Sequence, residues 1–280
     1  MLLKWKRDSR AEHGSISSTM ADFLKKVLRT RGNNTRDPLD KLPRPGDGIG
    51  YPVPYDGRRI QVDYELLKKC KVLSPYSGAY RLNDKVVMKT GEAVRMSEAV
   101  AMRLVAEKTS IPVPRVLDAY YQKSDGRGVI MMEYIEGETL DKPWPQYDSA
   151  QKQHVIAQLQ QYLNKLRTVK GGTIGAVDGS SCCDQFFTAE GTSYGPYSTE
   201  REFHRGLAQA LLERGNNSWC QMVSRFLASL DGHEIVPTHN DLAPRNILVS
   251  DGNVVAMLDW ELYGFYPDYW EYVKGYLCAD

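Results

Sequence analysis

The segment from Pro237 to Asn246, together with Asp259, carries side chains that could hold a metal ion and accept a proton. Between Asn246 and Asp259, two short apolar runs flank the pair Asp251-Gly252. An Asp-Gly pair between apolar runs predicts a tight β-hairpin, because both central residues of such a turn need positive φ. Closing this hairpin brings Asn246 next to Asp259, with Asp241 just upstream. Local geometry therefore predicts that Asp241, Asn246 and Asp259 share one site.

Carboxylate and amide oxygens are hard ligands that suit Mg²⁺, an ion that commonly completes its shell with substrate phosphates. A carboxylate beside such a metal that is not itself a ligand can accept the proton of an attacking hydroxyl. The spacing from His239 through Asp241 to Asn246, followed by Asp259, is that of the kinase phosphoryl-transfer template. Each residue alone also fits a turn or cap, so the joint spacing carries the prediction. A zinc site at His239 is disfavoured, since the segment has no second His or Cys at ligand spacing, and His239 is expected to brace the loop.

The residues His239-Asn-Asp241-Leu-Ala-Pro-Arg-Asn246 and Asp259-Trp260-Glu261 resemble the aminoglycoside phosphotransferase and choline kinase group, and more narrowly the fungal proteins of the phosphotransferase enzyme family. At the second of these two motifs, protein kinases usually have Asp-Phe-Gly, so Asp-Trp-Glu at this position points to the small-molecule branch of the group. The resemblance implies an α+β, protein-kinase-like, two-lobed fold with a small β-rich N-lobe and a mostly helical C-lobe. It also implies ATP and Mg²⁺ as cofactors, Asn246 and Asp259 as metal ligands, and Asp241 as the catalytic proton acceptor.

A kinase-like enzyme needs a lysine on a strand and an acidic partner on the next helix. The segment Lys85–Lys89 reads as a strand that ends in lysine, and Ser97–Lys108 reads as a helix with its first residue as N-cap. The resemblance implies that Lys89 contacts the ATP phosphates and that Glu98 orients it. Glu107 competes for this role, but an acid is less favourable in the last turn of a helix. On composition alone, Lys89 is one of 36 basic residues and fits a solvated strand end.

The segment Gly128–Gly137 reads as a buried strand that leaves into a connector. The resemblance puts the adenine-binding hinge there, with recognition through backbone groups. The same residues also fit a simpler alternative, an apolar strand that runs into a turn and binds nothing. The implied hinge residues are Glu133, Tyr134 and Ile135.

The loop expected to cover the phosphates, Ser74–Tyr80, is the weakest match to the family. It has a single glycine rather than a G-x-G-x-x-G pattern. It precedes Lys89 by the length of one hairpin, and the backbone amides near Ser77 and Gly78 could still approach a phosphate.

The C-terminal half is predicted to contain three amphipathic helices, with apolar stripes over Val155–Leu166, Phe203–Leu211 and Trp219–Leu230. Thr199 begins a capping box before the second helix, and Gly215 ends that helix. All three apolar faces are expected to be core. A loop as long as 171–198 is usually functional or disordered, and it is expected to help wall the acceptor site.

Acidic and aromatic residues near Asp259 bear on the acceptor. Together they could attract a cation such as an aminated sugar or a quaternary amine, but a solvated helix start with core contacts is the favoured interpretation. Only 21 residues follow Asp259, fewer than a protein kinase needs to bind a peptide. This shortness leaves a truncated chain or a degenerate enzyme as open interpretations, both with walls missing from the acceptor pocket. The residues concerned are Trp260, Glu261, Tyr266, Asp268, Trp270 and Glu271.

A chain of 280 residues can bury a full core divided into lobes. The expected parts are an N-terminal extension, 1–62, with one amphipathic helix and a linker, an ATP-binding N-lobe, 63–136, and a catalytic C-lobe, 137–280. The net charge of +1 argues for neither a nucleic-acid nor a membrane partner, and no apolar run is long enough to span a bilayer. Five cysteines without metal spacing suggest reduced thiols in a cytoplasmic protein, and a monomer is favoured.

The sequence therefore predicts an ATP- and Mg²⁺-dependent phosphotransferase that moves the γ-phosphoryl group to a hydroxyl of a small molecule. The alternative is a nucleotide-binding pseudokinase or scaffold that is weak or inactive in catalysis. The single-glycine loop and the short C-terminus motivate that alternative, and the joint presence of Asp241, Asn246 and Asp259 speaks against it.

Overall fold

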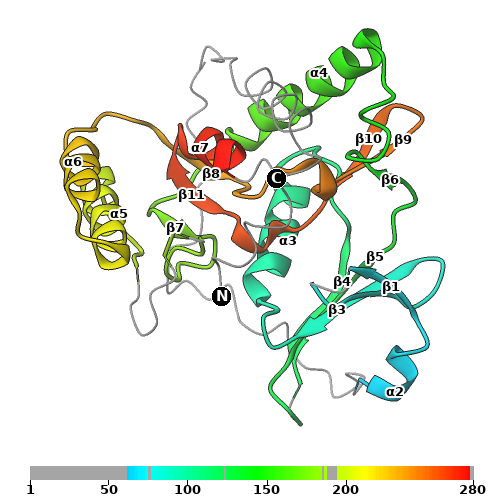
Figure 1. Ribbon diagram of the computed structural model, residues 1–280. Helices are drawn as coiled ribbons and strands as arrows, with labels where there is room; N and C mark the ends of the chain where they lie inside the picture. Colours follow the sequence, from blue (N-terminus) through cyan, green and yellow to red (C-terminus); the bar gives the residue numbers. More distant parts are fainter. Residues whose placement is uncertain (1–61, 75–76, 123, 185, 188–193, 278–280) are drawn as a thin grey trace.

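The computed structural model describes residues 62–74, 77–122, 124–184, 186–187 and 194–277. These residues form two lobes, one built on a five-stranded sheet and the other mostly helical with two three-stranded sheets (Figure 1). The predicted α+β, two-lobed architecture is confirmed. Residues 1–61, which contain the predicted N-terminal helix and linker, lie outside the described residues.

The N-lobe sheet is antiparallel throughout, with strand order β1-β2-β3-β5-β4. Lys89 lies inside β3, opposite Ala79 on one neighbour and Ile130 on the other. The prediction that the strand ends at Lys89 is wrong, because pairing with β5 continues to Gly91. The strands are β1 (Lys71–Ser74), β2 (Ala79–Arg81), β3 (Val86–Gly91), β4 (Val116–Tyr121) and β5 (Gly128–Glu133).

Two helices cover the two faces of this sheet. The short α2 (Tyr64–Leu67) packs on the face that carries Met88, and α3 (Met96–Lys108) packs on the face that carries Val87. The prediction of Ser97 as N-cap is wrong, because the cap position belongs to Arg95 and Ser97 is buried in the first turn. Helix α3 also contacts the C-lobe, which explains why most of its first three turns are buried.

The C-lobe core is built around α4, which begins at a capping box formed by Asp148 and Gln151. Its predicted apolar stripe is buried from Val155 to Leu166, as expected. The other C-lobe elements connect in the order shown in Figure 1. The elements are β6 (Glu138–Thr139), α4 (Ser149–Leu166), β7 (Gly175–Ala176), α5 (Glu200–Arg214), α6 (Ser218–Leu227), β8 (Ile235–Thr238), η1 (Pro244–Asn246), β9 (Ile247–Ser250), β10 (Asn253–Met257), η2 (Trp260–Leu262), β11 (Gly264–Pro267) and α7 (Trp270–Leu277).

Strands β9 and β10 form the predicted hairpin, with Met257 opposite Ile247 at its open end. Asp251 and Gly252 occupy its turn with φ of 49° and 75°, as a tight turn of this kind requires. Leu258 N donates to the backbone oxygen of Asn246 at 2.8 Å, so the pairing extends one residue beyond the strands.

Helices α5 and α6 pack side by side at one edge of the C-lobe, at the left of Figure 1. Thr199 is the N-cap of α5, since its side chain accepts from Glu202 N at 3.2 Å. The predicted capping box is incomplete, because the Glu202 side chain accepts from Ser198 N rather than from Thr199 N.

The expectation that the whole apolar face of α6 is core is wrong. Leu227 packs on a core cluster, and Val223 and Leu230 are partly buried, but three side chains of the stripe are about 60% exposed. They are Trp219, Met222 and Phe226. Across the described ranges, no helix has both the length and the apolar character needed to cross a membrane.

Candidate phosphoryl-transfer site

The loop that carries Asp241 follows β8 and is held in place by α7. Glu271 accepts hydrogen bonds from the backbone N–H groups of His239, at 2.6 Å, and Asn240, at 3.1 Å. Asn240 has a left-handed backbone with φ of 71°, and its side chain donates to the backbone oxygen of Leu262 at 2.8 Å. Burial raises the pKa of Glu271 to about 7, and the two backbone donors oppose this shift. One buried carboxyl group therefore fixes the turn that leads into Asp241.

His239 braces the same loop, as the sequence predicted. Its Nε2 lies 3.0 Å from the backbone oxygen of Leu258, and Asp241 N donates to its Nδ1 at 3.3 Å. These contacts fit a neutral imidazole protonated on Nε2. Burial lowers the pKa of His239, which favours that form, and its ring packs on Trp260 with the centroids 4.5 Å apart. His239 links the loop of Asp241 to the residue before Asp259.

Both carboxylate oxygens of Asp241 are bonded. Asn246 Nδ2 donates to its Oδ2 at 2.7 Å and to its backbone oxygen at 2.9 Å. Arg245 Nη2 donates to its Oδ1 at 2.6 Å. The Asp241 side chain is 16% exposed, so it is close to solvent at the edge of this network.

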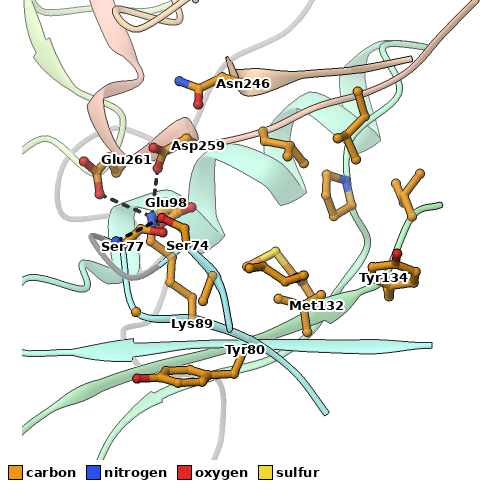
Figure 2. Close-up of a pocket in the computed structure, with 18 of the residues that line it drawn as sticks. Ser74, Ser77, Tyr80, Lys89, Glu98, Met132, Tyr134, Asn246, Asp259 and Glu261 are labelled. Carbon is orange, nitrogen blue, oxygen red and sulfur yellow. Dashed lines mark hydrogen bonds and ion pairs between the residues drawn. The ribbon is translucent and has the colours of Figure 1, made fainter. Parts of the chain in front are cut away.

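Asn246 and Asp259 meet at the open end of the β9–β10 hairpin. Asp259 has a left-handed backbone with φ of 62°, which turns its side chain out of the line of β10. The Asn246 amide nitrogen is used by Asp241, and Figure 2 shows the amide oxygen on the side of Asp259. An amide oxygen and a carboxylate facing one another form a hard oxygen donor pair, which is the chemistry that Mg²⁺ prefers. The residues present therefore fit a magnesium ion.

Three carboxylates surround the Lys89 ammonium (Figure 2). The distances from Lys89 Nζ are 2.8 Å to Glu98 Oε2, 2.8 Å to Asp259 Oδ1 and 3.3 Å to Glu261 Oε2. The lysine bonds Glu98 rather than Glu107, whose carboxylate is exposed and pairs with Lys108.

Burial and charge act on this cluster in opposite directions. Burial by itself would lower the pKa of Lys89, but its three carboxylate neighbours outweigh this and raise it well above its ordinary value. Burial raises the pKa of Glu98, and the Lys89 ammonium opposes that shift. Glu98, Asp259 and Glu261 also lie close enough together to hold a cation. Since Lys89 already supplies a positive charge at their centre, the pair Asn246 and Asp259 is the better candidate for the metal.

A cavity of about 1100 Å³ lies between the lobes, and the four residues of this cluster are part of its lining. Most of the site residues predicted from the sequence line it, on both lobes. Asp241 is not among the lining residues, but Arg245, which is bonded to it, is. The predicted residues that line the cavity are Ser77, Gly78, Lys89, Glu98, Glu133, Tyr134, Ile135, Asn246 and Asp259.

Gly78 and the hinge residues line the cavity on the side of the N-lobe. Gly78 has φ of 62°, and a Cβ atom there would lie 2.3 Å from the backbone oxygen of Thr90 on β3. The single glycine of the loop is therefore required for close packing of β2 on β3. In the hinge, Tyr134 N donates to the backbone oxygen of Lys85 at 2.8 Å, so this N–H is already paired within the N-lobe.

Sequence reasoning placed three residues outside the network around Asp241 and Lys89 that the structure brings into it, two of which, Glu261 and Glu271, it considered only as acceptor contacts. Glu261 follows Asp259 by two positions, so its spacing was a usable signal. Arg245 directly precedes Asn246, but the local sequence does not indicate the direction in which its side chain points. Glu271 was weighed only as an acceptor contact, and its bonds to the Asp241 loop depend on tertiary packing. The buried Trp260, Tyr266 and Trp270 bear out the core contacts predicted for the aromatic residues near Asp259, but the solvated helix start predicted with them is wrong for Glu271, which is buried.

Comparison with known proteins agrees with this geometry. Two crystal structures of a thermostable mutant of aminoglycoside phosphotransferase APH(4)-Ia, one in apo form and one a ternary complex with AMP-PNP and hygromycin B, share the fold at 14% identity and a TM-score of 0.50. Each match covers 69% of this chain, which spans 65% of the length of those chains. No curated protein matches the chain in sequence. The family model described as "Phosphotransferase enzyme family" matches residues 77–275. The chain therefore belongs to the phosphotransferase enzyme family.

Proposed function

We propose that this chain transfers the γ-phosphoryl group of ATP to a hydroxyl of a small molecule. The observation that carries this proposal is the meeting of Asp241 with Asn246 at the open end of the hairpin that also carries Asp259, with Asp259 bonded to the Lys89–Glu98 ion pair beside a cavity of about 1100 Å³. A cavity of this size can accept a nucleotide.

In the proposed reaction, the acceptor hydroxyl gives its proton to the Asp241 carboxylate while its oxygen forms a bond to the γ-phosphorus. The bond between that phosphorus and the β,γ-bridging oxygen breaks, and ADP leaves with the electron pair. Asn246 and Asp259 would hold Mg²⁺, which would neutralise charge on the phosphates when bound. Most of the catalysis in such a site comes from positioning and charge neutralisation.

The N-lobe would fix the nucleotide. Lys89, oriented by Glu98, would contact the phosphates, and the backbone at Ser77 and Gly78 would cover them. The adenine ring would lie against the hinge formed by Glu133, Tyr134 and Ile135. Each of these residues lines the same cavity, which supports the proposal.

Two substitutions test the assigned roles. Asp241→Asn removes the proton acceptor and should lower turnover by about 10²–10⁴-fold while ATP binding persists. Asp259→Ala removes a metal ligand and should abolish the Mg²⁺ dependence of ATP binding. Both are measured by calorimetric titration and by steady-state turnover, and unchanged turnover in Asp241→Asn would exclude Asp241 as the base.

A thermal-shift titration with ATP, with and without Mg²⁺, followed by turnover measurements over a panel of acceptors, distinguishes the pseudokinase alternative from the proposed phosphotransferase. The panel includes hygromycin B, which a structure of the same fold contains. Binding without turnover on every acceptor favours the pseudokinase, whereas the proposed phosphotransferase predicts turnover with at least one hydroxyl compound. No nucleotide binding would rule out both.

A further inference from the structure

The carboxylate proposed to receive the acceptor proton is covered on one oxygen by a cation. Arg245 Nη2 donates to Asp241 Oδ1 at 2.6 Å, and Asn246 bonds the other oxygen at 2.7 Å. A carboxylate oxygen can accept more than one hydrogen bond, so these bonds by themselves do not block the base. However, Arg245 lines the cavity and Asp241 does not, so an acceptor hydroxyl in the cavity meets the guanidinium before it meets the carboxylate. To reach Oδ1 from the cavity, the hydroxyl needs Arg245 to move.

The two donors differ in how firmly they are held. Asn246 is 7% exposed, its backbone N donates to Ala243 at 2.8 Å, and its side chain makes two bonds to Asp241. The Arg245 side chain is 50% exposed and reaches Asp241 from the middle of the short helix η1. Because the Arg245 end of the pair is half exposed, water can solvate the guanidinium when it leaves, and Asn246 stays bonded to the less exposed Asp241 carboxylate. Arg245 is the mobile donor.

The same arginine lines the nucleotide cavity with Lys89, Asn246 and Asp259. Lys89 is surrounded by three carboxylates, so it presents little net positive charge to a triphosphate. A guanidinium can form two parallel hydrogen bonds to phosphate oxygens, whereas Arg245 reaches the Asp241 carboxylate through Nη2 alone. A terminal phosphate in this cavity would therefore compete with Asp241 for Arg245.

We propose that Arg245 alternates between the Asp241 carboxylate and the terminal phosphate of the bound nucleotide, so that ATP itself uncovers the base. This inference rests on the proposed phosphotransferase function. When Arg245 moves to the γ-phosphate, Oδ1 of Asp241 becomes accessible to the acceptor hydroxyl. ADP lacks that phosphate, so Arg245 returns to Asp241 after transfer. The result is a base exposed only while a transferable phosphoryl group is present.

The test compares the affinities for ATP and ADP, both with Mg²⁺, by calorimetric titration of the wild-type chain and Arg245→Met. Methionine keeps an unbranched side chain and removes the guanidinium. We expect ATP affinity to fall about 10- to 100-fold, with ADP affinity changed by less than about twofold. Arg245→Lys should restore part of the ATP affinity, because it restores the charge without the paired donors. Arg205→Met, at an exposed arginine on α5, is the control and should change neither.

The outcomes separate this inference from the function on which it rests. If the wild-type chain turns over ATP and Arg245→Met weakens ATP and ADP equally, or neither, Arg245 does not contact the terminal phosphate and the inference is wrong. If the wild-type chain binds ATP but transfers phosphate to no acceptor, the proposed function fails, and the ATP-to-ADP ratio still decides whether Arg245 binds the phosphate. If the wild-type chain binds no ATP, both proposals are overturned.

Discussion

Replacing Lys89 by methionine tests the buried charge cluster that joins the lobes. The ammonium is bonded to Glu98, whose side chain is 2% exposed, at 2.8 Å. Removing one partner of a buried ion pair leaves an uncompensated charge and costs about 3–5 kcal/mol. Asp259 and Glu261 are 26% and 37% exposed, so water can solvate them and they add little to this cost. We therefore expect Lys89→Met to lower the free energy of unfolding by about 3–5 kcal/mol, measured by urea denaturation.

The cost should depend on pH in a defined direction. Without the ammonium, burial acts unopposed on Glu98 and raises its pKa further above its unfolded value. The folded variant then binds a proton that the unfolded chain releases, so its free energy of unfolding rises as pH falls. In the wild-type chain the pKa of Glu98 is already raised to about 7, so both proteins hold this proton at lower pH. The deficit relative to wild type should therefore shrink as pH falls toward 7 and change little below it.

Two further variants test whether the buried charge of Glu98 causes the loss of stability. Lys89→Met combined with Glu98→Gln removes both charges and should recover roughly half or more of the lost stability, by double-mutant cycle. Lys68→Met, which breaks the exposed pair with Glu65, should cost less than about 1 kcal/mol. If Lys89→Met costs no more than Lys68→Met, or if Glu98→Gln brings no recovery, the buried-charge reasoning is incorrect.

Three other predictions concern the Asp241 loop, the glycine of the N-lobe and the exposed face of α6. The pKa of Glu271 is raised from 4.5 to about 7 by burial, so the folded state holds an extra proton between these pH values and stability falls by roughly 3 kcal/mol as pH rises through them. Glu271→Gln should remove this contribution and make that part of the pH profile less steep, leaving the contribution of Glu98, whose pKa is also raised to about 7, and an unchanged profile would contradict the assignment. Gly78→Ala forces a Cβ atom within 2.3 Å of the Thr90 backbone oxygen and should weaken ATP binding at least tenfold by titration, whereas unchanged affinity would show that the loop lies elsewhere. Trp219→Ser should change the free energy of unfolding by less than about 0.5 kcal/mol, because the ring is 60% exposed, and a larger loss would mean that the ring is buried.

The sequence was most informative where contacts are local. Asp251 and Gly252 specify a turn by their tolerance of positive φ, and the position of that turn sets which residues of the flanking runs meet at the open end. Asn246 and Asp259 could therefore be brought together before any tertiary structure was known. The same holds for the Thr199 cap, which depends on a side chain and an N–H three residues apart.

Predictions failed or were missing where tertiary packing decides. Lys89 was expected at a strand end because the local sequence does not show how far β5 pairs with β3. The apolar face of α6 looked like core because periodicity reports amphipathicity but not which face meets a neighbour. Arg245 and Glu271 entered the network through side-chain directions set by other elements.

The bond between Lys89 and Asp259 spans 170 positions of the chain, whereas Asn246 and Asp259 come from a single hairpin. The hairpin half can form from contacts of low sequence separation, but the lysine half exists only after a long loop has closed. A ligand that bridges both halves therefore stabilises the docking of one lobe on the other as it binds. Its affinity includes the free energy of that docking, so a substitution far from the cavity that loosens the lobes would weaken nucleotide binding without touching a single ligand contact.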